Sequence, residues 1–155
     1  MIDITWKTGP TLASLRRLQS EFHPAMTQAV ENVFTLMMVN IVLKTPKPGE
    51  PPEPASQRYV RTGRLVNGWA KAAAHVGIAL PTPTRGVAQA TDSQFVPVDT
   101  ADEISRKAIN TVPYGQYVEN GAPTVTARHM VGSTLMQLRD NNVLATEVRE
   151  AWRRL

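Results

Sequence analysis

The chain has 155 residues, of which 42% are hydrophobic and 19% charged, and its formal net charge is +4 at pH 7. This composition is typical of one globular domain over residues 1–155, and it excludes a disordered chain. The absence of cysteine excludes disulfides, thiolate metal ligands and a cysteine nucleophile. Aromatic residues, at 6%, are too scarce for a surface that stacks single-stranded nucleic acid.

The N-terminal part of the chain predicts two consecutive helices. A short helix is expected from Thr11 to Glu21, and Pro24, which a first helical turn tolerates, begins a longer one that ends near Lys44. Apolar residues at three- and four-residue spacing make the second helix the strongest prediction, and its last turns should be buried by the domain or by a neighbour. The most apolar run, Val33 to Leu43, is shorter than the roughly 20 residues of a bilayer crossing, so no membrane partner is expected.

Residues 45–57 are predicted to form an extended, proline-rich loop or arm that projects from the domain. Five prolines between Thr45 and Pro54 exclude a helix, because proline cannot continue one and disfavours helical geometry in the residue before it. A proline-rich ligand for a signalling module is the alternative to a stiff assembly arm. The candidate contact residues in this segment are Lys47, Pro48, Pro51 and Pro52.

A basic block follows the proline-rich segment. Between Pro54 and Thr91 there is no acidic residue, and the five basic ones are Arg58, Arg61, Arg64, Lys71 and Arg85. Clustered charge of one sign favours an anionic partner, either nucleic acid or an acidic protein surface, although a solvated loop face is the simpler explanation. No known nucleic-acid-binding signature accompanies the block. Arg58 and Arg61 are the interface or DNA-channel candidates.

The middle of the chain predicts short elements. A helix should follow Thr62 as its N-cap, with Gly63 allowing a tight backbone and Leu65 lying one turn before Trp69. Alternation predicts a strand from His75 to Leu80, unless the preceding alanines extend the helix. After a loop from Pro81 to Asp92, a strand is expected over Ser93 to Val98. The pattern T-A-D-E at Thr100 to Glu103 then resembles a capping box and predicts a helix to about Asn110.

The C-terminal third predicts a buried segment and then two helices. Tyr114, Tyr117 and Val118 should supply buried groups before a turn at Asn120-Gly121. The segment from Ala127 to Met130 leads into a helix that Asp140 to Asn142 interrupts, and a last helix runs from Val143 to Leu155. Together these elements predict an α+β fold, in which a small antiparallel sheet is flanked by a long N-terminal helix and by C-terminal helices.

Catalytic and metal-binding patterns are weak, and an enzyme is not expected. The three histidines are more than fifty residues apart and show no metal-ligand spacing, and no serine lies in a G-x-S-x-G elbow. Glu119 could act as a general acid or base if it were buried beside a substrate. A carboxylate bonded to turn N–H groups or to an arginine is the favoured alternative, and Arg64 and Arg128 are the expected partners of an ion pair. No cofactor or metal is expected.

Three segments together resemble the tail-component family of tailed bacteriophages, also described as head-tail joining, neck or tail-completion proteins. They are R-T-G-R-L at Arg61 to Leu65, Y-x-x-Y-V-E-N-G at Tyr114 to Gly121, and A-R-H-M at Ala127 to Met130. The family order is similar: an N-terminal helix, a Thr-Gly-x-Leu turn, strands, a Tyr-x-x-Val-Glu-x-Gly strand and turn, and an Ala-Arg-x-apolar helix start. The chain departs from it at Asn120 to Ala122, where Phe-Gly-Thr is common, and in its proline-rich insert. The motif residues are Thr62, Gly63, Arg64, Leu65, Tyr117, Glu119, Gly121 and Arg128.

The resemblance implies a structural subunit of the virion. Such a subunit would form a homo-oligomeric ring of about six or twelve copies in the neck or at the head-proximal end of the tail, around the DNA channel. Its partners would be the connector or head-closure proteins and the tail-tube or terminator proteins, with non-specific DNA contact, after assembly in the host bacterial cytoplasm. The alternatives are a tail terminator ring, a small basic DNA-binding regulator, and a hydrolase centred on Glu119 and His129.

Overall fold

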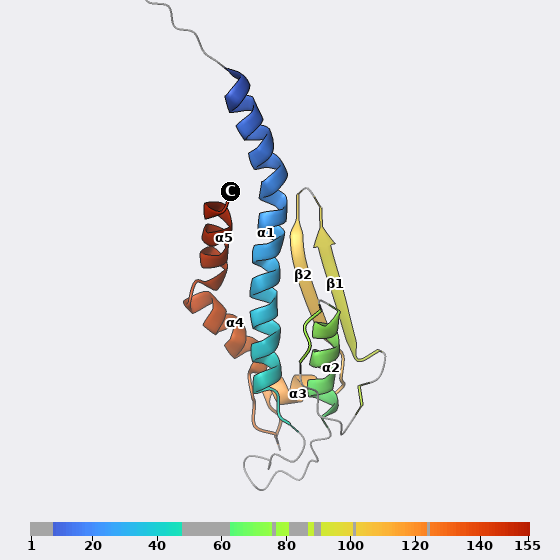
Figure 1. Cartoon of the computed structure of the whole chain (residues 1–155). Coiled ribbons are helices and arrows are strands. Elements are labelled where there is room, and N and C mark those ends of the chain that lie inside the picture. Colours follow the sequence, from blue (N-terminus) through green and yellow to red (C-terminus); the bar gives the residue numbers. More distant parts are fainter. Residues whose placement is uncertain are drawn as a thin grey trace, which may run out of the picture.

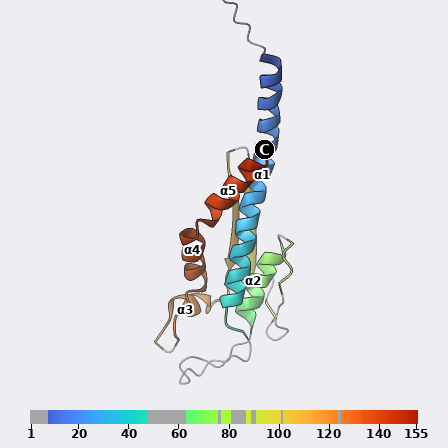
Figure 2. The same ribbon diagram turned by 60° about the vertical axis from the view of Figure 1, so that its left-hand side comes forward.

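The computed structural model is organised around one helix, α1, which spans Thr8–Lys44 and lies against most of the other elements (Figure 1). Helices α4 and α5 pack along one side of α1, whereas α2 and the two strands pack along the other, as the turned view also shows (Figure 2). The structure describes residues 8–47, 63–75, 77–80, 87–88, 91–100, 102–123 and 125–155.

The described elements confirm the α+β prediction. They comprise five helices and one antiparallel pair of strands, with the long helix first and helices again at the C-terminal end. The elements after α1 are α2 (Arg64–Ala74), β1 (Ser93–Asp99), β2 (Ile104–Asn110), α3 (Gly115–Asn120), α4 (Met130–Asp140) and α5 (Val143–Arg153).

The prediction that Pro24 begins a second helix is wrong, because α1 continues through it. An internal proline removes a hydrogen bond and crowds the carbonyl four residues before it, at a cost of about 3 kcal/mol. Tertiary contacts on both sides of the proline offset this cost. Phe22, before it, makes an edge-to-face contact with Trp152 of α5, and Ala29, after it, is buried. Packing against α5 therefore holds together a helix that the local sequence would divide.

The C-terminal half of α1 supplies the main core. Phe34 and Met38 are buried against Ala72 and Ala73 of α2, and Phe95 of β1 packs on the same cluster. The part of α1 from Arg16 to Lys44 is also long and apolar enough to cross a membrane by length and composition alone, a test that core helices of soluble proteins pass as well. The face that carries Phe34 and Met38 is buried within the fold, and 28% of the most apolar stretch of α1 is buried in all.

The burial predicted for the last turns of α1 is only partly correct. Ile41 and Val42 are buried, but Leu36 and Leu43 of the same turns are exposed. The sequence left open whether the domain or a neighbour covers these turns, and the domain covers only one face.

A β-hairpin replaces the helix that was predicted over Thr100 to Asn110. Strand β1 confirms the expected strand, and it pairs with β2 from Ser93↔Asn110 to Asp99↔Ile104. The Thr100 hydroxyl accepts the Glu103 N–H at 3.0 Å, as in a capping box, but the Thr100 N–H donates to the Glu103 carbonyl at 2.8 Å and closes a hairpin turn. A helix N-terminus with a capping box and this hairpin turn share the contact between the Thr100 hydroxyl and the Glu103 N–H. The sequence pattern could therefore not distinguish the helix from the hairpin.

The predicted strand over His75 to Leu80 is absent, and the alternative of a longer helix is correct as far as Ala74. The Ile78 N–H donates to the Ala73 carbonyl at 3.2 Å and the Gly77 N–H to the Ala74 carbonyl at 3.1 Å. This pair of bonds, with φ +74° at Gly77, is a Schellman motif. Ile78 then packs on the core cluster, so the apolar alternation reflects a helix end and not a strand.

Candidate assembly surfaces

The three motif segments meet in one small core. Leu65 from the first, Val118 from the second and Met130 from the third are buried together with Val112. The Arg128 N–H donates to the Val118 carbonyl at 2.8 Å, which joins the second segment to the third. Residues that lie up to 65 positions apart in the sequence therefore pack together where α2, α3 and α4 meet.

The first segment forms the start of α2. Gly63 occupies the N-cap with φ 84°, a conformation that glycine adopts without strain, and no side chain caps the helix. The prediction that Thr62 is the N-cap is therefore wrong, and Thr62 itself lies outside the described residues. Arg64 Nε donates to Asp92 Oδ2, and its Nη2 donates to Oδ1, both at 2.7 Å. These bonds to the buried Asp92 carboxylate, and then its charge, raise the pKa of Arg64 above its ordinary value.

Glu119 binds the N-terminus of α4. Its carboxylate accepts the Gly132 N–H at 2.8 Å and the Val131 N–H at 3.1 Å. The predicted ion pair with Arg64 or Arg128 is wrong, and the alternative of bonds to N–H groups is correct. His129, at the N-cap of α4, makes no side-chain capping bond, so Glu119 satisfies donors that would otherwise lack a partner. A carboxylate engaged in this way caps α4 and joins α3 to it.

The second segment is helical where the resemblance implies a strand. Helix α3 contains Tyr117 and Val118, and Gly121 ends it with φ 84°. Val118 is buried as predicted, but Tyr114 and Tyr117 are exposed. Tyr117 and Val118 are adjacent in α3 and therefore point to different faces of the helix, whereas Tyr114 lies before it, at the N-cap.

Replacing Glu119 with alanine should lower the free energy of unfolding by about 1–2 kcal/mol, because two N–H groups of α4 lose their acceptor and the helix dipole loses its anion. Glu119→Gln should cost less, since its amide oxygen still accepts a hydrogen bond. Urea denaturation measures both. The exposed Glu103 provides a matched Glu→Ala control, and an equal effect at the two positions would contradict the capping role.

The predicted arm is buried at its beginning. Thr45 and Pro46 are buried, and the Thr45 hydroxyl donates to the Ile41 carbonyl at 2.6 Å, so no projection starts at residue 45. Lys47 is exposed. The other candidate contact residues, Pro48, Pro51, Pro52, Arg58 and Arg61, lie outside the described residues.

A charged network that the sequence did not reveal joins α1 to the hairpin. Arg106 of β2 is only 6% exposed, and its guanidinium lies 3.0 Å from Glu31 and 3.6 Å from Asp99. His23 Nε2 lies 2.5 Å from the other Asp99 oxygen. These residues come from α1, β1 and β2, and α1 is far from the two strands in sequence, so no motif spacing could have found them. The network fixes the hairpin turn against α1.

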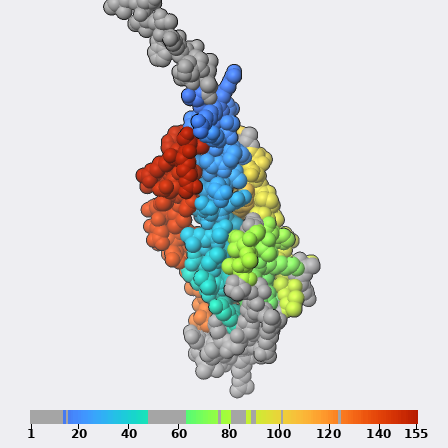
Figure 3. Space-filling model, in the orientation of Figure 1, coloured from blue at the N-terminus to red at the C-terminus, as the bar shows by residue number. Residues whose placement is uncertain are grey.

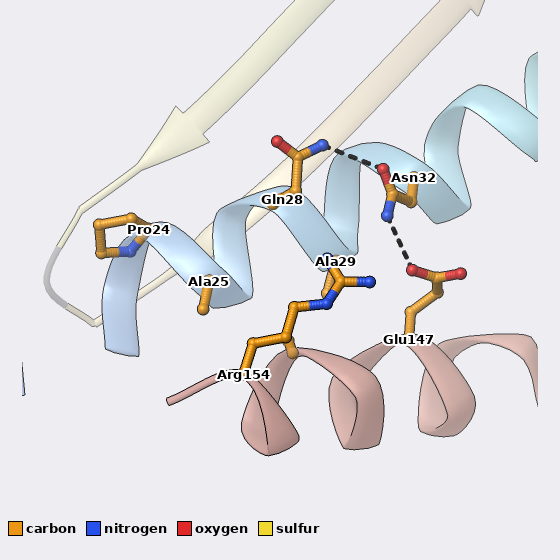
Figure 4. A pocket seen from close by; sticks show the side chains of 8 residues that line it. Pro24, Ala25, Gln28, Ala29, Asn32, Glu147 and Arg154 are labelled. Carbon is orange, nitrogen blue, oxygen red and sulfur yellow. Dashed lines mark hydrogen bonds between the residues drawn. The ribbon is translucent and has the colours of Figure 1, made fainter. Parts of the chain in front are cut away.

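A shallow groove lies between α1 and α5 (Figure 4). The Gln28 amide donates to Asn32 at 3.0 Å, and the Asn32 amide donates to Glu147 of α5 at 2.8 Å. Its lining combines these polar groups with small residues, Pro24, Ala25, Ala29 and Ala151, and with Arg154. The lining contains no nucleophile beside a base, and its hydrogen bonds join α5 to α1.

A row of exposed apolar side chains lies on α5. Leu144, Val148 and Trp152 are four residues apart, so they form one stripe along the helix, here called the α5 stripe. Their exposed fractions are 52%, 37% and 55%. The helix contacts α1 mainly through Glu147 and the buried Ala151, and at its C-terminal end the edge of Trp152 also contacts Phe22 of α1. Figure 3 shows α5 along the flank of the molecule. Contiguous apolar side chains in such a position mark an interaction surface.

Comparisons with known proteins add no assignment. No protein-family model, curated protein or solved structure matches the chain. In the part of the chain that the structure describes, no group of three or more histidine, cysteine, aspartate or glutamate side chains could hold a metal ion.

Proposed function

We propose that the chain is a structural subunit of a tailed-phage virion, which forms a ring in the neck or at the head-proximal end of the tail and joins head to tail around the DNA channel. The observation that carries this proposal is the meeting of Leu65, Val118 and Met130 in one core cluster. The segments that resemble the tail-component family thereby act as one structural unit. A chance likeness of three separate short motifs would not require them to pack together.

Two further features support an assembly role. Arg64 and Glu119, two of the three charged residues of the motif, bind Asp92 and the N-terminus of α4, as expected of structural residues. The α5 stripe exposes apolar side chains to water. Burying them against another subunit would lower the free energy, because removal of apolar surface from water is favourable. Both features fit a protein whose work is to bind other subunits.

The proposal is tested by removing the gene from the virus that encodes it and examining the particles by electron microscopy. We expect filled heads and separate tails that fail to join, and rings in the purified protein. Joined particles of normal infectivity would refute the neck assignment. A monomer or dimer that prefers one DNA sequence at high salt would instead support a DNA-binding regulator. Tails of irregular length would support the tail terminator.

Deleting Lys47 to Glu53 should leave the melting temperature nearly unchanged, because Thr45 and Pro46, which are buried, are retained. The proposed assembly arm would be lost, and heads and tails should then fail to join. A replacement of the same seven residues by a Gly/Ser sequence serves as the control for loop length. Normal infectious yield from the deletion would exclude an arm in this segment.

A further inference from the structure

The α5 stripe has a charged border. Arg149 and Arg153 are one turn apart and each follows a stripe residue, so an arginine row runs beside Leu144, Val148 and Trp152. Arg153 contacts Glu150 at 2.8 Å, whereas Arg149 makes no ion pair with any described residue. An occupant of the stripe must therefore bring apolar groups and an acidic edge.

The hairpin, on the other side of α1, has the complementary character. Asp102 and Glu103 lie in its turn, both are exposed, and within the described ranges neither carboxylate forms an ion pair. Val96 of β1 is also 43% exposed, but its register partner is the exposed Lys107, so the acidic part of the hairpin is its turn. Figures 1 and 3 show the hairpin and α5 on opposite flanks of α1, so the hairpin cannot reach the α5 stripe of its own chain.

We propose that the α5 stripe of one copy binds the hairpin of a second copy, with the arginine row against Asp102 and Glu103. Two complementary surfaces on opposite flanks give a head-to-tail contact, which closes into a ring when the rotation between copies allows it. A two-fold contact between two α5 stripes would instead bring the two arginine rows together, and like charges oppose such a pairing. The inference rests on the proposed ring function and names the surfaces that would build it.

A charge exchange tests this contact. The variant Arg149→Glu and the double variant Asp102→Lys/Glu103→Lys alter exposed side chains, and circular dichroism should show both folded. Each alone should weaken self-association about tenfold or more in sedimentation velocity. When the two are mixed, the glutamate of one faces the lysines of the other, and assembly should return. Arg139→Glu is the matched control, because Arg139 is exposed on α4 and outside the stripe, and it should assemble like the unmodified chain.

The outcomes of the charge exchange distinguish a failure of the proposed contact between α5 and the hairpin from a failure of the proposed ring function. Restored assembly in the mixture supports the head-to-tail contact. Unchanged rings in both charge variants overturn this surface while the ring function stands. Loss of assembly in Arg149→Glu alone overturns the hairpin as the occupant. An unmodified chain that stays monomeric at high concentration overturns the contact and the ring proposal together, whereas failure of the particle experiment with intact rings overturns only the neck function.

Discussion

Replacing Arg64 with methionine should strongly lower the stability of the fold. The Asp92 carboxylate is 4% exposed and receives two hydrogen bonds of 2.7 Å from Arg64. Methionine has a similar length but no donor, so the carboxylate would remain buried without its cation, an arrangement that is strongly destabilising. Urea denaturation should show a clearly lower midpoint with an unchanged slope.

The control for this prediction is Arg139→Met. Arg139 is 88% exposed and only approaches Asp140 at 3.8 Å, so its loss should leave the midpoint nearly unchanged. The bonds to Asp92 raise the pKa of Arg64. The stability that the pair adds is therefore fully present below the ordinary pKa of arginine, and it is lost only as the pH rises through the raised pKa. Stability should therefore not fall because of this pair as the pH increases from 7 to about 10. Equal midpoints for the Arg64 and Arg139 variants would contradict the role of the pair.

Replacing Gly68 with alanine should destabilise the protein, although alanine favours a helix by about 1 kcal/mol. A Cβ at this position would lie 2.8 Å from the Asn110 amide nitrogen. The Asn110 side chain cannot move freely, because it donates to the Leu65 carbonyl at 2.9 Å and accepts the Val112 N–H at 3.1 Å. Overpacking of this kind costs about 1–3 kcal/mol, and each lost hydrogen bond adds about 1 kcal/mol, so the clash outweighs the helix propensity.

A double-mutant cycle separates the clash from the propensity. With Asn110 shortened to alanine, the space beside Gly68 opens, and Gly68→Ala should become neutral or stabilising. Thermal or urea unfolding of the four proteins gives the coupling between the two positions. Additive effects would show that the glycine is not required by the approach of Asn110.

Several features could be predicted from the sequence because they depend on neighbouring residues. The apolar spacing from Met26 to Ile41 predicts a buried helix face wherever the helix packs. A helix after Thr62-Gly63 was predicted, although its N-cap is Gly63 and not Thr62. The break from Asp140 to Asn142 follows from residues that favour turns, with Asn142 at φ 50°. For the candidate assembly surfaces, the sequence predicts that Leu144, Val148 and Trp152 share one helix face. It does not predict that these side chains are exposed in the folded chain.

Other features were decided by contacts between distant segments. The local contact at Thr100 and Glu103 serves a helix or a hairpin equally well, and the hairpin prevails because it places Phe95 against Phe34 of α1. The sequence predicts structural roles for Arg64 and Glu119, but it does not identify Asp92 or the N-terminus of α4 as their partners. No sequence spacing links a side chain to a partner that only folding brings close. The sequence by itself determined which segments are amphipathic helices, because that depends on residues within a few turns. Only the tertiary structure decided that α1 continues through Pro24, that Arg64 binds Asp92 and that α5 leaves its apolar stripe exposed, because these depend on which surfaces the folded chain brings together.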